Sequence, residues 1–524
     1  MSKIITHSLF SLVFAALFFL PDLIYKIAQP EYFVFNSKLY KEFIAFFILN
    51  FILLSISSGK IRYFFYFIFI SFSLSELLHY SFFHSLIMPY EVPMLFDQSE
   101  EMLDSFKGVW QYMLVPVVIY FGLMVLMYLL LRKINNYLLK GRIIPVLLIV
   151  FLLSAGSLVA SKRESPYVFL PKSESTSIKN MYNVVSWSIA KELPKLWGKR
   201  EKVPVFKPYQ INDVNIKKPQ TIVVVMGESL GSKYMSLYGF DKSTTPLLEK
   251  RADELQYTWG YSAGVNTDVA VPTFFFVKRE PQNNKIFLKG ETSLFALAKQ
   301  AGFVTHYVTT QKLTVVGGFL GTNVDKVLSK KDFKSEKITY DEVLVNYLKD
   351  VDFSKNNFIL LHQRNSHTPY AKQTPKAFYK YPFEDLPYEE HMRGSYYNSV
   401  LYTDYLLDSM INIIKKQAGS AVLFFTSDHS EMMGDKDEEG RFGHSYLGFT
   451  DAKVPMIIYT NDDAEYLDKE LNLKNTISHY QFGKLIVKSL GKEIINPNEN
   501  GEFYINGVDI SGSQGFLSYK KLDD

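Results

Sequence analysis

Acidic residues and a histidine follow two strongly apolar runs in the second half of the chain. Glu228 comes shortly after the run at 221–226, and Asp428 and His429 come directly after the run at 421–427. Such runs are typical of buried parallel strands, whose carboxyl ends form the ligand-binding edge of an open α/β sheet. Carboxylate and imidazole groups are ligands that suit Zn²⁺. The sequence therefore predicts that these three side chains form a metal site.

A lone threonine lies between these two runs. Thr267 stands in Gly264-Val-Asn-Thr-Asp-Val-Ala-Val-Pro272, where glycine and asparagine favour a turn that exposes a hydroxyl. A threonine hydroxyl is a poor nucleophile at neutral pH, and coordination to a metal activates it by lowering its pKa. One metal and this threonine would therefore suffice for a two-step phosphoryl transfer through a phospho-threonine. The predicted metal ligands are Glu228, Thr267, Asp428 and His429.

Each of these residues also has a simpler interpretation. Thr267 could make only local hydrogen bonds in its turn, and Glu228 could only charge the first turn of a following helix. Two more histidines, His367 and His444, follow an apolar run and an acidic loop respectively. Either imidazole could bind phosphoryl oxygens or protonate a leaving group. His444 could equally be a surface histidine.

Beyond about residue 220 the chain alternates strand-like and helix-like runs. The strand-like runs are 221–226, 303–309, 357–362, 421–427 and 454–460, and the helix-like runs include 291–301, 394–417 and 476–490. Alternation of this kind predicts an α/β domain built on a mostly parallel sheet with helices on both faces.

The N-terminal part of the chain holds most of the long apolar runs. Five of them have about the 17–25 residues that a membrane-spanning helix needs, at 7–25, 42–58, 63–88, 112–131 and 143–160. Segments 1–6, 59–62 and 132–142 contain basic residues and no acid, which predicts a cytoplasmic N-terminus. Because five spans is an odd number, everything after residue 160 is expected outside the cytoplasm.

We therefore expect a five-span transmembrane domain at 1–160, a linker at 161–220 and an external catalytic α/β domain at 221–524. The linker contains Trp187 and Trp197 in a helical pattern, typical of an interfacial helix or of a surface helix packed on the catalytic domain. Within the third span, Glu76 and His79 are either a functional intramembrane pair or hydrated residues near the outer boundary. The loop at 89–111 is acidic.

Composition excludes several classes of protein. The chain has no cysteine, so thiolate metal sites, a catalytic cysteine and disulfides are excluded. Its formal charge of +4 is spread without a Lys/Arg run, which argues against a nucleic-acid-binding protein.

In order and spacing, the motifs resemble those of the phosphoethanolamine transferases of Gram-negative envelopes, in the alkaline phosphatase/sulfatase superfamily. The matching segments are Met226-Gly-Glu-Ser229, Gly264-Val-Asn-Thr-Asp-Val-Ala-Val-Pro272, Leu361-His-Gln-Arg-Asn-Ser-His-Thr-Pro369, Asn398-Ser-Val-Leu-Tyr-Thr-Asp-Tyr405, Ser427-Asp-His-Ser-Glu431 and Gly443-His444.

The resemblance implies a specific reaction. Thr267 would accept phosphoethanolamine from phosphatidylethanolamine, at a zinc site completed by Glu228, Asp428 and His429. His367 and His444 would serve the phosphoryl group or a second, more loosely held divalent metal. It further implies a multi-pass protein of the bacterial inner membrane, a catalytic domain in the periplasm, and an acceptor such as lipopolysaccharide lipid A or a core sugar.

The chain also departs from that family. Relatives that modify lipid A usually have disulfides in the outer domain, which weakens the assignment of lipid A as acceptor. Where those relatives have further polar contacts to phosphoethanolamine, this chain has Thr309-Thr-Gln-Lys312.

Three alternative functions can be compared with this one. A phosphoglycerol transferase would use the same threonine and metal with a different head group, acting on an envelope glycan. A sulfatase is disfavoured, because its formylglycine usually derives from a cysteine. A non-catalytic membrane-anchored scaffold is disfavoured because every expected ligand is present.

Overall fold

The computed structural model describes the chain except for residues 1–2, 29–38, 84–85, 88, 90–91, 93–98, 142, 164–165, 170, 172–174, 195–203, 314–315, 321–322, 334–339, 439–441, 475, 511, 513–514 and 521–524. The chain divides into two compact units. The first comprises 1–202 with 313–318, and the second comprises 203–312 with 319–524.

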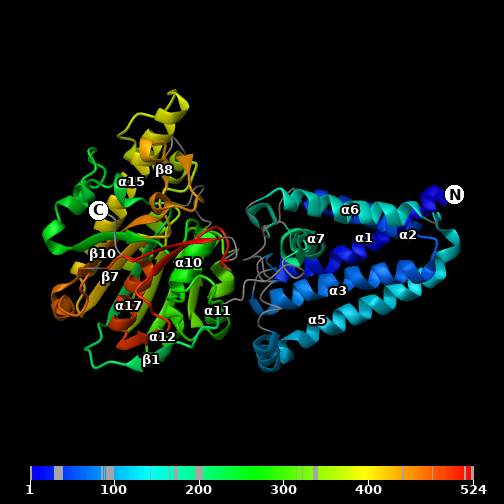
Figure 1. Cartoon of the computed structure of the whole chain (residues 1–524), viewed down its shortest axis with the longest axis horizontal. Coiled ribbons are helices and arrows are strands. Elements are labelled where there is room, and N and C mark those ends of the chain that lie inside the picture. Colours follow the sequence, from blue (N-terminus) through cyan, green and yellow to red (C-terminus); the bar gives the residue numbers. More distant parts are fainter. Residues whose placement is uncertain are drawn as a thin grey trace. The chain divides into compact units, whose positions relative to one another are not determined.

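The described part of the first unit is helical (Figure 1). Its long helices are α1 (Lys3–Ala28), α2 (Leu39–Ser55), α3 (Gly59–Phe83), α5 (Ser99–Ile134) and α6 (Ile144–Ser161). Four of them, all except α2, are long and apolar enough to cross a membrane. With 17 residues, α2 is at the lower end of the length that a bilayer requires. Each of the five predicted spans overlaps one of these five helices, although 42–58 extends past α2 and 63–88 extends past α3, where residues 84–85 and 88 lie outside the described part. The chain is a multi-pass membrane protein.

Two details of this unit differ from the expectations. Helix α5 begins at Ser99, so the second half of the predicted loop 89–111 is helical, while residues 90–91 and 93–98 lie outside the described part. In the predicted linker, α7 (Ser177–Trp187) packs against α3 and α6. Trp187 in this helix is buried, and Trp197 lies outside the described residues.

Glu76 in α3 is buried and accepts two hydrogen bonds. The donors are the backbone N–H of Ile87, at 2.9 Å, and the side-chain amide of Asn180 in α7, at 2.9 Å. Buried polar groups in proteins are normally hydrogen-bonded in this way. This geometry argues against the hydrated interpretation of Glu76.

The second unit contains a seven-stranded sheet in the order β3-β10-β7-β2-β6-β4-β5. The strands are β2 (Thr221–Gly227), β3 (Gln256–Tyr261), β4 (Val304–Thr309), β5 (Lys326–Leu328), β6 (Asn357–His362), β7 (Ala421–Ser427) and β10 (Lys453–Thr460). The five strands from β7 to β5 pair in parallel, whereas β10 runs antiparallel to both β7 and β3. The predicted mostly parallel sheet is confirmed, and each predicted strand is present.

Helices cover both faces of this sheet. On one face, α13 (Glu342–Lys349) and α15 (Tyr388–Lys415) share a core with Val223 of β2 and Phe425 of β7. On the other, Phe482 of α17 (His479–Ser489) packs on Phe424 of β7, and α12 (Leu294–Gln300) packs on β6. The alternation of Phe424 and Phe425 follows from the two-residue period of a strand.

Shorter elements complete the described second unit. Its remaining helices are α9 (Pro246–Glu249), α10 (Thr267–Phe275), α11 (Lys285–Lys289), α14 (Tyr370–Gln373) and α16 (Phe449–Ala452). Three two-stranded sheets pair β1 (Gln210–Asp213) with β11 (Lys492–Ile495), β8 (Met432–Met433) with β9 (Phe442–Gly443), and β12 (Phe503–Asn506) with β13 (Phe516–Tyr519).

Gly394 in α15 tests how tightly this helix is packed. In a helix, Gly→Ala usually stabilises by about 0.5–1 kcal/mol. Here a Cβ would lie 2.0 Å from the carbonyl oxygen of Pro382, and overpacking of this kind costs about 1–3 kcal/mol. We therefore expect Gly394→Ala to lower the thermal unfolding midpoint of the second unit, measured by calorimetry. The control Gly448→Ala, whose nearest neighbour is Tyr446 O at 4.0 Å, should leave it unchanged, and equal midpoints would contradict the packing.

Candidate active site

The parallel pairing of β2 with β7 brings two carboxylates together. Gly227 and Ser427, the last residues of these strands, are register partners, and Glu228 and Asp428 follow them directly. Both side chains are buried, as is His429. The predicted meeting of these three residues at the carboxyl ends of the strands is what the structure shows.

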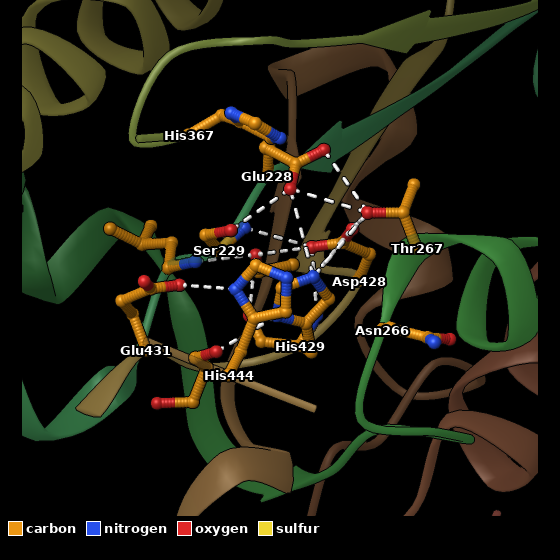
Figure 2. Close-up of polar contacts among 12 residues, drawn as sticks. Glu228, Ser229, Asn266, Thr267, His367, Asp428, His429, Glu431 and His444 are labelled. Atoms are coloured by element: carbon orange, nitrogen blue, oxygen red, sulfur yellow. Dashed lines mark hydrogen bonds and ion pairs between the residues drawn. The ribbon is translucent and has the colours of Figure 1, made fainter. Parts of the chain in front are cut away.

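Thr267 reaches these side chains from the start of α10. It is the first residue of the helix, and the side-chain oxygen of Asn266 caps the helix by accepting from the backbone N–H of Val269 at 3.1 Å. The Thr267 hydroxyl donates to Asp428 Oδ2 at 2.7 Å (Figure 2). It lies 3.3 Å from both oxygens of Glu228.

His429 presents a nitrogen lone pair to this cluster. Its Nδ1–H donates to the carbonyl oxygen of Ser430 at 2.8 Å, which fixes the proton on Nδ1 and leaves Nε2 unprotonated. Nε2 is 3.3 Å from Asp428 Oδ2, 3.6 Å from Glu228 Oε1 and 3.4 Å from the Thr267 hydroxyl. Burial lowers the pKa of His429 to about 3, so the ring is neutral at physiological pH.

These donors fit a divalent cation. One ligand atom each from Glu228, Asp428 and His429 lies within 4.8 Å of the others. Burial, with the charge of Glu228 next, raises the pKa of Asp428 well above its usual range. Two buried carboxylates this close cannot both ionise without a compensating charge, and the neutral His429 does not supply one. Two oxygen donors, an imidazole and a hydroxyl are a donor set that Zn²⁺ accepts.

His444 lies beside this cluster and is held by an acid. Its ring centroid is 4.3 Å from that of His429, and its Nδ1 is 2.8 Å from Glu431 Oε2 (Figure 2). Burial opposes the charged form, but the hydrogen bond and charge of Glu431 outweigh it and raise the pKa of His444 to about 9. Tyr370 donates to the other oxygen of Glu431 at 2.7 Å. His444 is therefore an imidazolium at neutral pH.

His367 lies on the other side of the cluster, next to Glu228 (Figure 2). It is partly exposed, and its Nδ1–H donates to the carbonyl oxygen of Thr368 at 2.6 Å. The structure thus brings all six predicted site residues to one place at the edge of the sheet.

Comparison with known proteins agrees with this geometry. The sulfatase family model matches residues 220–490, about half of the chain. The chain belongs to the sulfatase family. This match and the curated relatives confirm the resemblance to the phosphoethanolamine transferases of that superfamily.

Two curated relatives illustrate the match. The chain is 23% identical over 265 residues to the Kdo(2)-lipid A phosphoethanolamine 7''-transferase of Escherichia coli, covering 48% of this chain and 46% of that protein. It is 29% identical over 269 residues to phosphoethanolamine transferase EptA of Salmonella typhimurium, covering 47% of each. The chain therefore spans about half the length of the curated relatives it matches.

A solved structure shares the fold of the second unit. The C-terminal periplasmic domain of EcEptC from Escherichia coli, in a complex with Zn, superposes with a TM-score of 0.50 at 20% identity. The match covers 61% of this chain and 98% of that domain. At this identity the match shows a common sulfatase-family fold and nothing about chemistry.

Gln311 is a site residue that the sequence did not identify. Its side-chain amide donates to Glu228 Oε2 at 2.6 Å and to the carbonyl oxygen of Gln363 at 2.7 Å, and it lies 3.0 Å from His362 Nε2. It belongs to the segment Thr309–Lys312, which begins with the last residue of β4. Its position directly after a strand was the sequence feature that could have indicated a role in the site.

Ser229 is another site residue that the sequence did not identify. Its backbone has a positive φ of 53°, a conformation that costs energy for a residue with a side chain. In this conformation its N–H donates to Asp428 Oδ1 at 2.9 Å and its hydroxyl donates to Glu228 Oε1 at 2.9 Å. Ser229 therefore holds both carboxylates at once.

Metal content tests the cluster directly. We expect the purified protein to hold about one divalent metal ion per chain by elemental analysis, and His429→Ala to lose most of it because Nε2 is the only nitrogen donor of the set. The control is His391→Ala in α15, whose ring bonds the carbonyl oxygen of Phe383. Equal metal content in the two variants would remove His429 from the ligand set.

Gln311 should affect the metal through Glu228. Loss of a residue that orients a metal ligand typically weakens metal affinity about 10–100-fold, so we expect Gln311→Ala to do so in competition with a chelating dye. The control Gln373→Ala, in α14, should bind metal as the wild type does. Wild-type affinity in Gln311→Ala would show that Glu228 is held well enough by Ser229 alone.

Proposed function

We propose that this chain is a phosphoethanolamine transferase. It would move phosphoethanolamine from phosphatidylethanolamine to an envelope acceptor, lipopolysaccharide lipid A or a core sugar, through a phospho-threonine on Thr267. The observation that carries the proposal is the Thr267 hydroxyl at the start of α10, 2.7 Å from Asp428 Oδ2 and in contact with Glu228 and His429. The printed names of the curated relatives support the head group.

The proposed cofactor is one Zn²⁺, held by Glu228, Thr267, Asp428 and His429. When bound, it would lower the pKa of the Thr267 hydroxyl and offset negative charge on the phosphoryl group. The contacts of Ser229 and Gln311 orient the two carboxylates, and the Ser430 carbonyl oxygen fixes the His429 tautomer.

In the first half-reaction, Thr267 Oγ1 attacks the donor's phosphorus and the bond from phosphorus to the diacylglycerol oxygen breaks. Asp428 Oδ2 is the nearest acceptor for the proton that Thr267 loses. The imidazolium of His444 has a proton to give to the departing diacylglycerol oxygen. The N-terminus of α10 favours negative charge on the phosphoryl group bound to its first residue.

In the second half-reaction, an acceptor hydroxyl attacks the same phosphorus and the bond to Thr267 Oγ1 breaks. The proton transfers reverse: His444 takes the acceptor's proton, and Thr267 regains its own. His367, which lies next to Glu228 (Figure 2), would bind a phosphoryl oxygen in both steps. The enzyme therefore ends the cycle in its starting protonation state.

The donor is a membrane lipid, which suits a multi-pass protein. We propose the bacterial inner membrane as its location, with a cytoplasmic N-terminus and the catalytic unit in the periplasm, as the basic loops of the first unit indicate.

The covalent intermediate is the sharpest test of this function. Protein incubated with phosphatidylethanolamine and no acceptor should carry phosphoethanolamine on Thr267, detected by mass spectrometry of the peptide containing that residue. Thr267→Ala should lose the adduct and at least about 10³-fold of the transfer rate, because it removes the nucleophile. Thr267→Ser should keep partial activity, since it retains the hydroxyl but not the restricted rotamer.

Thr273 in the same helix provides the matched control. Its side chain is buried and lies outside the cluster, so Thr273→Ser should form the adduct at a normal rate. Transfer at the wild-type rate by Thr267→Ala would replace the covalent scheme with direct attack by the acceptor.

A further inference from the structure

The first residues of the second unit form a segment that is fixed at its C-terminal end. The backbone N–H of Lys207 donates to Asn498 Oδ1 at 2.9 Å, and Asn498 Nδ2 donates to the Lys207 carbonyl oxygen at 2.9 Å. Tyr209, two residues on, is buried; its hydroxyl donates to Glu280 and accepts from the backbone N–H of Arg279. The chain is therefore anchored to the second unit at Lys207 and Tyr209, directly after Val205 and Phe206.

This fixed segment displays an apolar side chain to the surroundings. Val205 is 99% exposed, and the neighbouring Phe206 is only partly buried. A single exposed apolar residue is common on protein surfaces. Here a second apolar residue follows it, and the backbone is fixed by hydrogen bonds from Lys207 onward.

Lysines lie beside Phe206 of this segment. Lys207, Lys285 and Lys289 line one hollow with Phe206, and all three lysines are exposed. Glu291 is the one acid among its lining residues. The hollow has a volume of about 30 Å³, which is room for about one water molecule and not for a small-molecule ligand. An exposed apolar residue that directly precedes, in sequence, two residues of this lysine-lined hollow suits an extended surface instead.

The position of this segment in the sequence indicates that the extended surface is a membrane. The segment directly follows, in sequence, the unit that contains the membrane-spanning helices. Lysines near a membrane are attracted to anionic phospholipid head groups, and apolar side chains enter the boundary between head groups and acyl chains.

We propose that Val205, Phe206, Lys207, Lys285 and Lys289 form a docking patch for a bilayer surface that carries anionic phospholipids. Val205 inserts between the head groups, and the three lysines bind their phosphates. The patch would hold the catalytic unit against the membrane independently of the chemistry at Thr267.

The absence of cysteine from the chain permits a clean test with the full-length protein. A nitroxide label on Val205→Cys, in nanodiscs of phosphatidylethanolamine and phosphatidylglycerol, reports its environment by power-saturation spectroscopy. We expect collisions with lipid-soluble oxygen to exceed those with a water-soluble nickel complex by at least about threefold. A label on Val304→Cys in β4, where Val304 is 41% exposed, should show the reverse preference. Nickel access at position 205 equal to that at 304 would overturn the proposal.

The lysines are tested by the same label at position 205. Lys207→Gln, Lys285→Gln and Lys289→Gln together should raise its nickel access, as should replacing phosphatidylglycerol with phosphatidylcholine. The control combines Lys349→Gln, Lys355→Gln and Lys474→Gln, three exposed lysines elsewhere on the unit, and should leave nickel access unchanged. Unchanged access in the first triple variant would overturn the role of the anionic head groups. Because neither readout uses catalysis, failure here leaves the transferase proposal intact.

Discussion

Glu228 and Asp428 each follow the last residue of one of two paired parallel strands, so the pairing of β2 with β7 buries two carboxylates together. Burying like charges is costly unless each has donors and the pair has a counter-charge. Ser229 and Gln311 supply donors to the carboxylates. Because His429 is neutral, positive charge comes from the imidazolium of His444 beside the cluster and would come also from a bound divalent cation. This electrostatic requirement explains the contacts that Ser229 and Gln311 make with the two carboxylates.

The surrounding elements hold that arrangement from several directions. From α15, the hydroxyl of Tyr396 donates to the carbonyl oxygen of Ser229 and accepts from the N–H of Gly231, which keeps the strained turn in place. The Asn266 cap fixes the start of α10 and with it the position of Thr267. On the far side, Glu431 keeps His444 charged. Thr267 and His444 are thus held by the helix cap and by Glu431 as well as by their contacts within the cluster.

Much of this could be predicted from the sequence. Long apolar runs ending in Glu228 and in Asp428 identify β2 and β7, since a strand buried on both faces has a nearly continuous apolar sequence. Five apolar segments identify the helices of the membrane unit for a similar reason. Motif order was enough to group Thr267, His367 and His444 with the predicted metal ligands.

Tertiary structure decided the rest, because contacts between distant residues leave no local pattern. Gln311 reaches Glu228 across 83 positions of sequence, and nothing within Thr309–Lys312 specifies that bond. The antiparallel direction of β10 and the packing of α7 against α3 and α6 likewise depend on which surfaces meet after folding. The local periodicity of the sequence determined the helices and strands, and with them the strand ends at which the candidate site forms. The hydrogen-bond donors that offset the cost of burying two carboxylates come from residues that only folding brings together.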